Sequence, residues 1–179
     1  MNFVMAGRGA TGYVLGRGAG SAAQWWMAAG VTPVAAYAPK GAASLAASYV
    51  NLANPGTYDA APGVAPTLGA DGWTLNGTQY LIAPLTISFA RNWSFVVRYA
   101  NANTNTGVLF GIRAADSSAR VQIVPGRVGD NRQYIYGNSA AVLTIAGGGT
   151  PTGVLGIAGA TAYRNGSSDG AISGANGAA

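Results

Sequence analysis

The feature that most constrains this chain is a succession of roughly nine short segments with strand character, separated by turn residues at spacings near ten positions. The strongest segment is WSFVVRY at residues 93–99, which is rich in aromatic and β-branched residues. Residues 120–124, RVQIV, alternate polar and apolar side chains, as expected for a sheet with one buried face. This rhythm predicts an all-β sandwich or barrel.

Turn signals divide these segments. Asn76-Gly77 lies between residues 73–75 and 79–82, and because Asn-Gly favours the positive φ angles of a tight turn, we expect these two strands to form a hairpin. A second Asn-Gly turn is expected at Asn165-Gly166, and another turn at residues 129–131.

The remaining segments are weaker. Residues 34–37 are expected to form a short strand, and residues 41–53 either a short helix or a compact loop. Residues 58–68 read as a connection that is rich in proline and alanine. From Ser167 onward, glycine, serine and alanine predict no further strand of any strength.

Residues 1–33 differ from the rest and predict an extended N-terminal arm, followed by a β-sandwich over residues 34–179. Glycines 7, 9 and 12 match the pattern G-x-G-x-x-G, but the strand, helix and acidic residue of a dinucleotide site are missing around them. We expect the arm to be ordered against a neighbouring subunit. The candidate assembly residues are the large apolar side chains of the arm: Phe3, Val4, Tyr13, Trp25 and Trp26.

Composition excludes several kinds of chemistry. The chain has no histidine, no cysteine and no glutamate, so histidine triads, thiolate zinc sites and cysteine nucleophiles are excluded. Asp116, Asp130 and Asp169 are expected in turns, where aspartate is ordinarily structural. We therefore predict a protein that is not an enzyme, with no cofactor and no metal.

Charge is sparse, with ten basic and five acidic residues in 179, and it suits a surface that packs in an assembly. The arginines form no basic run, so we expect no nucleic-acid partner. No apolar run is long enough to cross a membrane. Arg8 and Arg17 interrupt the stretch that a signal peptide would need, so lysis or a leaderless route is the expected way out of a cell.

The order of motifs resembles the laminin-G-like, concanavalin-A-like jelly-roll modules of tailed-bacteriophage virion proteins. Three stretches are similar to the family's strand and turn motifs: GWTLNGTQYL at residues 72–81, GVLFGI at residues 107–112 and ATAYRNG at residues 160–166. Residues 51–57 look like the counterpart of its first loop, and residues 93–99 of its next strand. The resemblance covers residues 34–170 and implies a two-sheet antiparallel jelly roll.

The chain departs from that family in two places. Many members carry an aspartate where this chain has Asn76, and the loop at Asn51 also lacks a carboxylate, so the resemblance implies no secure calcium site. The family also continues past the motif at residues 160–166 with further strands. Either the sequence is incomplete or a neighbour supplies a strand, and exchange of the N-terminal arm is one hypothesis.

Three functions remain open at this point. The resemblance implies a virion structural protein, either capsid-decorating or tail-associated, located on the particle surface with itself and other virion proteins as partners. The alternative is a carbohydrate-binding module for a cell-surface glycan, in which exposed aromatic rings contact sugar. Its candidate residues are Trp25, Tyr134, Tyr136 and Tyr163, although Tyr134 and Tyr136 also suit a core or interface face. A self-assembling extracellular subunit is the third.

Overall fold

The computed structural model describes residues 33–85, 94–100, 102, 108–113, 119–127, 130–138 and 141–173. Over these residues the chain is an all-β protein whose strands pair antiparallel throughout. The elements are a 3₁₀ turn, η2 (Ala47–Tyr49), and the strands β1 (Ala61–Val64), β2 (Thr67–Gly69), β3 (Gly72–Thr74), β4 (Tyr80–Ile82), β5 (Ser94–Tyr99), β6 (Phe110–Arg113), β7 (Ala119–Arg127), β8 (Asn131–Asn138), β9 (Val142–Ile145), β10 (Gly153–Ala158), β11 (Thr161–Arg164) and β12 (Ser167–Ala171).

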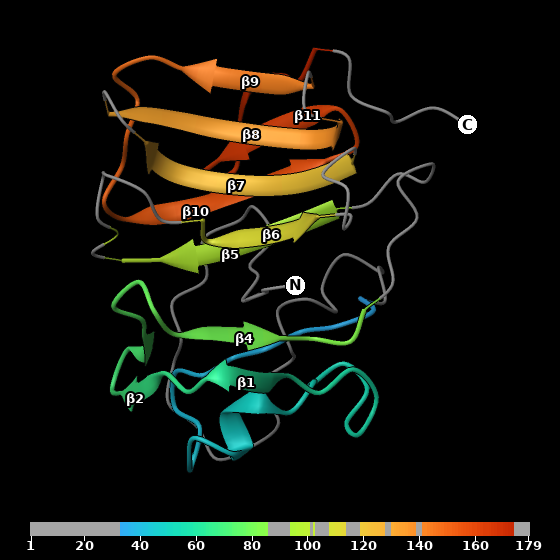
Figure 1. Ribbon diagram of the computed structural model, residues 1–179, viewed down its shortest axis with the longest axis vertical. Coiled ribbons are helices and arrows are strands. Elements are labelled where there is room, and N and C mark those ends of the chain that lie inside the picture. Colours follow the sequence, from blue (N-terminus) through green and yellow to red (C-terminus); the bar gives the residue numbers. More distant parts are fainter. Residues whose placement is uncertain are drawn as a thin grey trace.

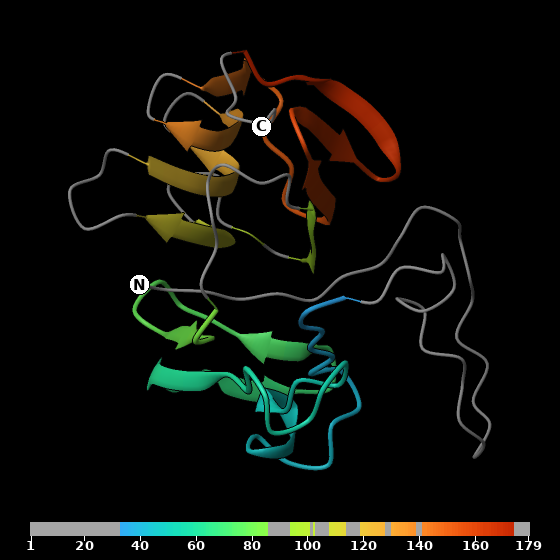
Figure 2. The same cartoon turned by 90° about the vertical axis from the view of Figure 1, so that its right-hand side faces the viewer.

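Two four-stranded sheets form a sandwich (Figures 1 and 2). The front sheet, nearer the viewer in Figure 1, has the strand order β6-β7-β8-β9, and the back sheet has the order β12-β11-β10-β5. Phe95 of the back sheet and Phe110 of the front sheet meet in the core with ring centroids 4.3 Å apart. The prediction of an all-β sandwich with antiparallel sheets is therefore confirmed.

The core lies between these sheets, and it follows from the alternation of side chains along each strand. Val121, Ile123 and Tyr134 point inward from the front sheet and are at most 1% exposed. Leu155 and Ile157 are the corresponding inward positions of β10 in the back sheet. These buried residues belong to one hydrophobic cluster, so the two sheets share a single core.

Residues 33–85, here called the β1–β4 region, lie at one end of the sandwich (Figure 1). They contain two small sheets, β1 paired with β4 and β2 paired with β3. Tyr37 and Leu81 of this region are at most 1% exposed and belong to the same hydrophobic cluster as the sandwich core. The region therefore packs onto the sandwich through apolar side chains.

The predicted hairpin across Asn76-Gly77 is wrong. Residues 72–74 pair instead with β2 through the tight turn between Gly69 and Gly72, and β4 pairs with β1. Gly77 does adopt a positive φ of 97°, and the side-chain oxygen of Asn76 accepts a hydrogen bond from the hydroxyl of Thr78 at 2.8 Å. The dipeptide thus bends the chain, but it joins two different sheets.

Three weaker assignments are also corrected. Residues 34–37 form no strand, residues 61–64 of the expected connection form β1, and Ser167–Ala171 form β12. The candidate helix at residues 41–53 contains only the η2 turn, which agrees with the compact-loop alternative. The sequence Ser-Ser-Asp-Gly-Ala has a low β propensity, and tertiary contacts hold it in the strand β12.

The second Asn-Gly turn is confirmed. Asn165 and Gly166 have φ angles of 49° and 87° and connect β11 to β12 as a two-residue turn. The Asn165 side chain also accepts a hydrogen bond from the backbone N–H of Val154 at 2.9 Å. This bond ties the turn to β10 and fixes the position of the edge strand β12.

Candidate functional site

Two of the four candidate sugar-contacting residues lie in the core. Tyr134 and Tyr136 of β8 are 0% and 2% exposed. A ring with no exposed face cannot stack on a sugar, so the expectation of carbohydrate contact at these two residues is corrected. Their shared inward face instead agrees with the core alternative, because residues two apart on a strand face the same side of the sheet.

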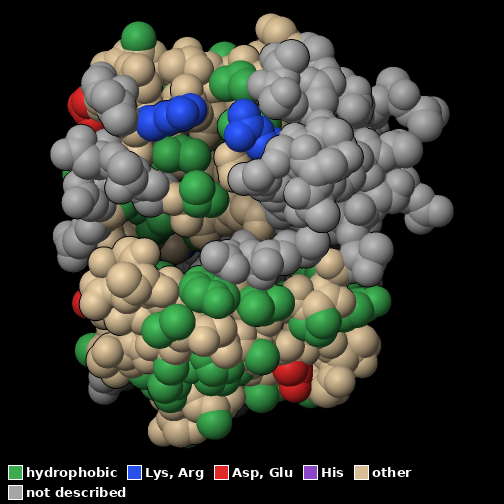
Figure 3. Space-filling view, viewed as in Figure 1, with side chains coloured by type: hydrophobic (Ala, Val, Ile, Leu, Met, Phe, Trp, Pro, Cys, Tyr) green, Lys and Arg blue, Asp and Glu red, His purple; other side chains and the backbone are tan. Residues whose placement is uncertain are grey.

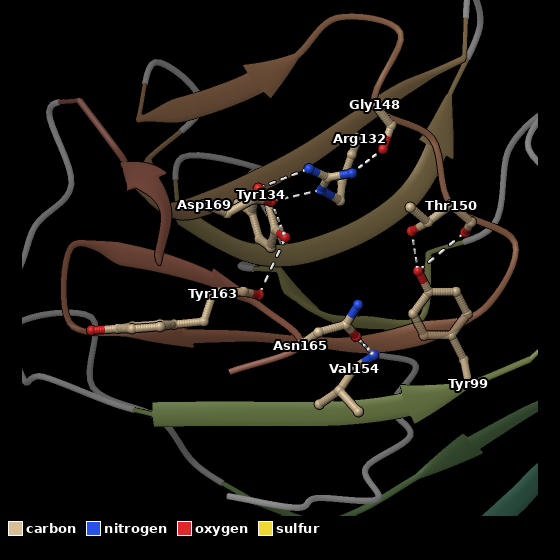
Figure 4. A network of polar contacts seen from close by, with 9 residues as sticks. All are labelled: Tyr99, Arg132, Tyr134, Gly148, Thr150, Val154, Tyr163, Asn165 and Asp169. Atoms are coloured by element: carbon tan, nitrogen blue, oxygen red, sulfur yellow. Dashed lines mark hydrogen bonds and ion pairs between the residues drawn. The ribbon is translucent and has the colours of Figure 1, made fainter. Parts of the chain in front are cut away.

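Tyr163 of β11 is the candidate that reaches solvent, with 36% of its surface exposed. Figure 4 shows its ring pointing away from the polar cluster between the sheets. Its direct neighbours in the back sheet are Gly156 on β10 and Ser168 on β12. Neither has a bulky side chain, and Ser168 is exposed whereas Gly156 is buried, so the ring borders solvent on the side of β12.

The candidate assembly residues Phe3, Val4, Tyr13, Trp25 and Trp26 lie outside the described residues. Trp25, the fourth candidate for sugar contact, lies outside them as well. The arm and its residues stay a prediction.

The most elaborate polar arrangement is a cluster between the two sheets, here called the Arg132 clamp (Figure 4). Arg132 of β8 is 1% exposed, and its Nε and Nη2 atoms donate to the two carboxylate oxygens of Asp169 at 2.6 and 2.8 Å. Its Nη1 donates to the backbone carbonyl of Gly148. The Tyr134 hydroxyl donates to Asp169 at 2.7 Å. The clamp therefore joins the front sheet to β12 of the back sheet by a bidentate ion pair.

The pKa values of the clamp follow from its geometry. Burial alone would raise the pKa of Asp169, but the hydrogen bonds from Arg132 and Tyr134 outweigh burial and hold that pKa below its ordinary value. Burial and the hydrogen bond to Asp169 both raise the pKa of Tyr134. Asp169 is thus ionised and Tyr134 is neutral at neutral pH, so the described clamp holds no free acid, base or nucleophile.

A β-bulge positions the acidic partner. Ala162 pairs with Gly170 and Tyr163 pairs with Ser168, so Asp169 between them is an extra residue in the ladder. A bulge re-aims a side chain, and here the Asp169 carboxylate meets Arg132 across the sandwich. The expectation that Asp169 lies in a turn is therefore corrected, because the residue belongs to β12.

The loop at residues 51–57 is organised by Asn51, which is fully buried. Its side-chain oxygen accepts from the N–H groups of Ala36 and Ala53 at 2.9 and 3.0 Å, and its amide donates to the carbonyls of Val34 and Thr57 at 3.0 and 2.8 Å. All of its bonds are thus within the protein. Asn51 has a structural role and is not available to a ligand.

The two aspartates near this loop have different environments. Asp59 accepts hydrogen bonds from the backbone N–H groups of Asn51 at 2.7 Å and Gly56 at 3.1 Å. The Asp71 side chain is 93% exposed and pairs with Lys40 at 3.0 Å. Within the described ranges of the chain, no three acidic, histidine or cysteine side chains gather in a way that suits a metal ion.

A hollow of about 310 Å³ lies in the same region, lined by Ala38, Lys40, Gly41, Ala42, Ala47, Ser48, Val50 and Leu52. Ser48 is the only hydroxyl among these lining residues. Its Oγ donates to the carbonyl of Leu45 at 2.6 Å and accepts from the indole Nε1 of Trp73 at 2.7 Å. This hydroxyl is therefore engaged in local structure.

The outer surface of the β1–β4 region is apolar and nearly free of charge. Residues 33–85 contain only three charged side chains, Lys40, Asp59 and Asp71. All three are engaged in the contacts given above. Large exposed hydrophobic side chains gather here, namely Val34, Tyr58, Val64 and Leu75 at 38–46% exposure. Figure 3 shows hydrophobic side chains spread over this half of the front face. Such a surface has the charge depletion typical of the centre of protein interfaces.

In the part of the chain that the structure covers, no helix combines the length and the hydrophobicity needed to span a bilayer. Comparisons with family models, with curated proteins and with solved structures give no match for this chain.

Proposed function

We propose that the protein is a structural subunit of a bacteriophage virion, either capsid-decorating or tail-associated, with its sheets arranged as a laminin-G-like jelly roll. Its proposed partners are copies of itself and other virion proteins on the particle surface. The motif order of residues 34–170 supports the viral assignment. The observation that carries the assembly role is the apolar, charge-poor surface of the β1–β4 region.

This surface is proposed to be the contact between subunits, together with the N-terminal arm. In the isolated chain, 45% of the surface of Val64 on β1 is exposed, so this side chain contributes little free energy from burial. In an assembly it loses that exposure, and each buried Å² of apolar surface contributes about 25 cal/mol. Because residues 33–85 contain only three charged side chains, few charges would have to be desolvated on association.

The test is the native mass in solution of the wild type and of two matched variants. Val64→Asp places a charge on the proposed contact surface, and Val108→Asp places the same charge on a valine that is 50% exposed outside it. We expect a wild-type mass several times 17.8 kDa, a reduced mass for Val64→Asp, and an unchanged mass for Val108→Asp. A wild type that stays at 17.8 kDa across concentrations would contradict the proposal.

A second candidate is a carbohydrate-binding module, and the observation that favours it is the exposed ring of Tyr163 beside Gly156 and Ser168. An open aromatic face on a sheet is a suitable platform for a sugar ring. Tyr163→Ala should abolish retention on a glycan array. The control is Tyr58→Asn, which removes the other tyrosine that is exposed among the described residues and suits the φ of 60° at this position. Equal retention of both variants and the wild type would refute this role for Tyr163.

A further inference from the structure

Asn54, Asn76 and Asn165 are exposed asparagines that differ in the residue that follows them. An asparagine is chemically labile because the backbone nitrogen of the next residue can attack its side-chain carbon Cγ. Glycine hinders this attack least, since it has no side chain. Asn76 and Asn165 both precede glycine, whereas Asn54 precedes Pro55, whose nitrogen carries no hydrogen to lose. Asn54 therefore serves as an internal control for the other two.

The backbone around Asn76 has few restraints. Residues 76–78 lie between β3 and β4, and within the described part of the chain they make no hydrogen bond between backbone groups. Gly77 is exposed, and a Cβ atom added to it would meet no atom within 4 Å. Nothing in the described structure therefore crowds the attacking nitrogen or keeps water away from it.

The backbone at Asn165 is held in place. Its N–H donates to the carbonyl of Val154 at 2.8 Å, and its side-chain oxygen accepts from the N–H of Val154 at 2.9 Å. Arg164 and Ser167, which flank the turn, are paired with each other. Closing a ring between the side chain and the backbone requires rotation about the bonds of the asparagine. The contacts with Val154 and the strand pairing oppose that rotation at Asn165.

Thr78 contacts the atom of Asn76 on which charge develops during such an attack. The Oδ1 atom of Asn76 accepts a hydrogen bond from the hydroxyl of Thr78 at 2.8 Å and from its backbone N–H at 3.3 Å. When the nitrogen of Gly77 bonds to Cγ, negative charge appears on Oδ1. Donors that already point at this oxygen stabilise the charge, as those of an oxyanion hole do.

We propose that Asn76-Gly77 is a site of spontaneous deamidation. The backbone nitrogen of Gly77 loses its proton and forms a bond to Cγ of Asn76, and the side-chain nitrogen leaves as ammonia. The product of this step is a succinimide ring. Water then opens the ring at either of its two carbonyl groups. Position 76 becomes aspartate or isoaspartate, and in both cases it gains one negative charge.

The new carboxylate lies beside the apolar surface of the β1–β4 region. Leu75, which directly precedes Asn76, belongs to that surface and is 41% exposed. A charge at this position has to be desolvated when a neighbouring subunit covers the surface. Deamidation therefore weakens the association of subunits, and this consequence rests on the proposed function. The covalent step itself does not depend on it.

The test incubates the purified full-length protein in mildly alkaline buffer and follows each asparagine by peptide mapping with mass spectrometry. We expect conversion at Asn76 to be at least about tenfold faster than at Asn165, and none at Asn54 over the same period. Asn176, which also precedes glycine, lies outside the described residues, and fragmentation of the peptides separates it from Asn165. Conversion at Asn76 that is no faster than at Asn165 would overturn the proposal.

A matched pair of variants tests the part that Thr78 plays. Thr78→Val removes the hydroxyl donor at nearly unchanged size and should slow conversion at Asn76 by about tenfold. Thr78→Ser keeps a hydroxyl and should convert at nearly the wild-type rate. Equal rates in the two variants would refute the role of the hydroxyl.

Association is measured separately, by native mass, so that the two proposals fail independently. Asn76→Asp installs the charge from the start and should lower the native mass, whereas Val108→Asp should leave it unchanged. Conversion at Asn76 in a wild type that stays monomeric would support the deamidation site and contradict the assembly role. An assembled wild type whose mass equals that of Asn76→Asp would overturn the effect of deamidation on association.

Discussion

Replacing Asp169 with asparagine should cost this protein a large part of its stability. The variant keeps the size of the side chain but leaves the Arg132 guanidinium, which is 1% exposed, without its counter-ion. Removing one partner of a buried ion pair costs about 3–5 kcal/mol. A domain of this kind has about 5–15 kcal/mol of unfolding free energy in total.

The assay is urea unfolding of the wild type, Asp169→Asn and the double variant Arg132→Met/Asp169→Asn. The double variant removes the buried charge as well. The amide oxygen introduced at position 169 still accepts from the Tyr134 hydroxyl, whereas the carbonyl of Gly148 loses its donor and the new amide N–H₂ group replaces an acceptor oxygen. We expect the double variant to be at least about 2 kcal/mol more stable than Asp169→Asn. A loss below about 1 kcal/mol in Asp169→Asn, with an unchanged m-value, would refute the reasoning, because Arg132 would then have to be hydrated.

The remaining predictions concern pH and local geometry. Because the folded-state pKa of Asp169 lies below its ordinary value of 3.8, its stabilisation is fully present above that value. The stability difference between the wild type and Asp169→Asn should therefore shrink as the pH falls below 3.8, measured by urea unfolding at each pH. Asn51→Ala removes the side-chain partner of four backbone groups and should lower the unfolding free energy by about 3 kcal/mol, whereas Asn51→Asp should keep part of that stabilisation. Gly170→Ala should cost about 1–3 kcal/mol, because the residue has a φ of 134° and its new Cβ would lie 3.2 Å from Leu143; an unchanged melting temperature would contradict this.

The sequence predicted the strands of the sandwich well where local pattern and tertiary environment agree. The predicted strands at residues 93–99 and 120–124 are apolar or alternating, and residues 94–99 and 120–124 lie in β5 and β7 as expected. Asn165-Gly166 forms the predicted turn because both flanking strands are long enough to pair. The predicted hairpin at Asn76-Gly77 is absent because its two flanking strands pair with other neighbours, β3 with β2 and β4 with β1.

The sequence analysis did not predict the Arg132 clamp, although the strand pattern around Arg132 indicated an inward arginine. Arg132 has the same strand parity as Tyr134 and Tyr136, so a core-facing pair of tyrosines implies an inward arginine as well. A buried arginine needs a carboxylate, and the chain has only five. What the sequence could not supply is the bulge that turns Asp169 inward, because a bulge depends on the register of the neighbouring strand.

The clamp also decides how the protein responds to a pulling force. Among the described strands, β12 lies at the edge of its sheet and pairs with β11 alone, and an edge strand pulled from its end ordinarily unzips one hydrogen bond at a time. Here Ile172, with 3% of its surface exposed, is anchored in the core, and Asp169 is tied to Arg132 of the opposite sheet. A force applied to the chain after Ala171 therefore acts on the contact between the two sheets. β12, which its sequence did not predict as a strand, thus helps to hold the two sheets together under force.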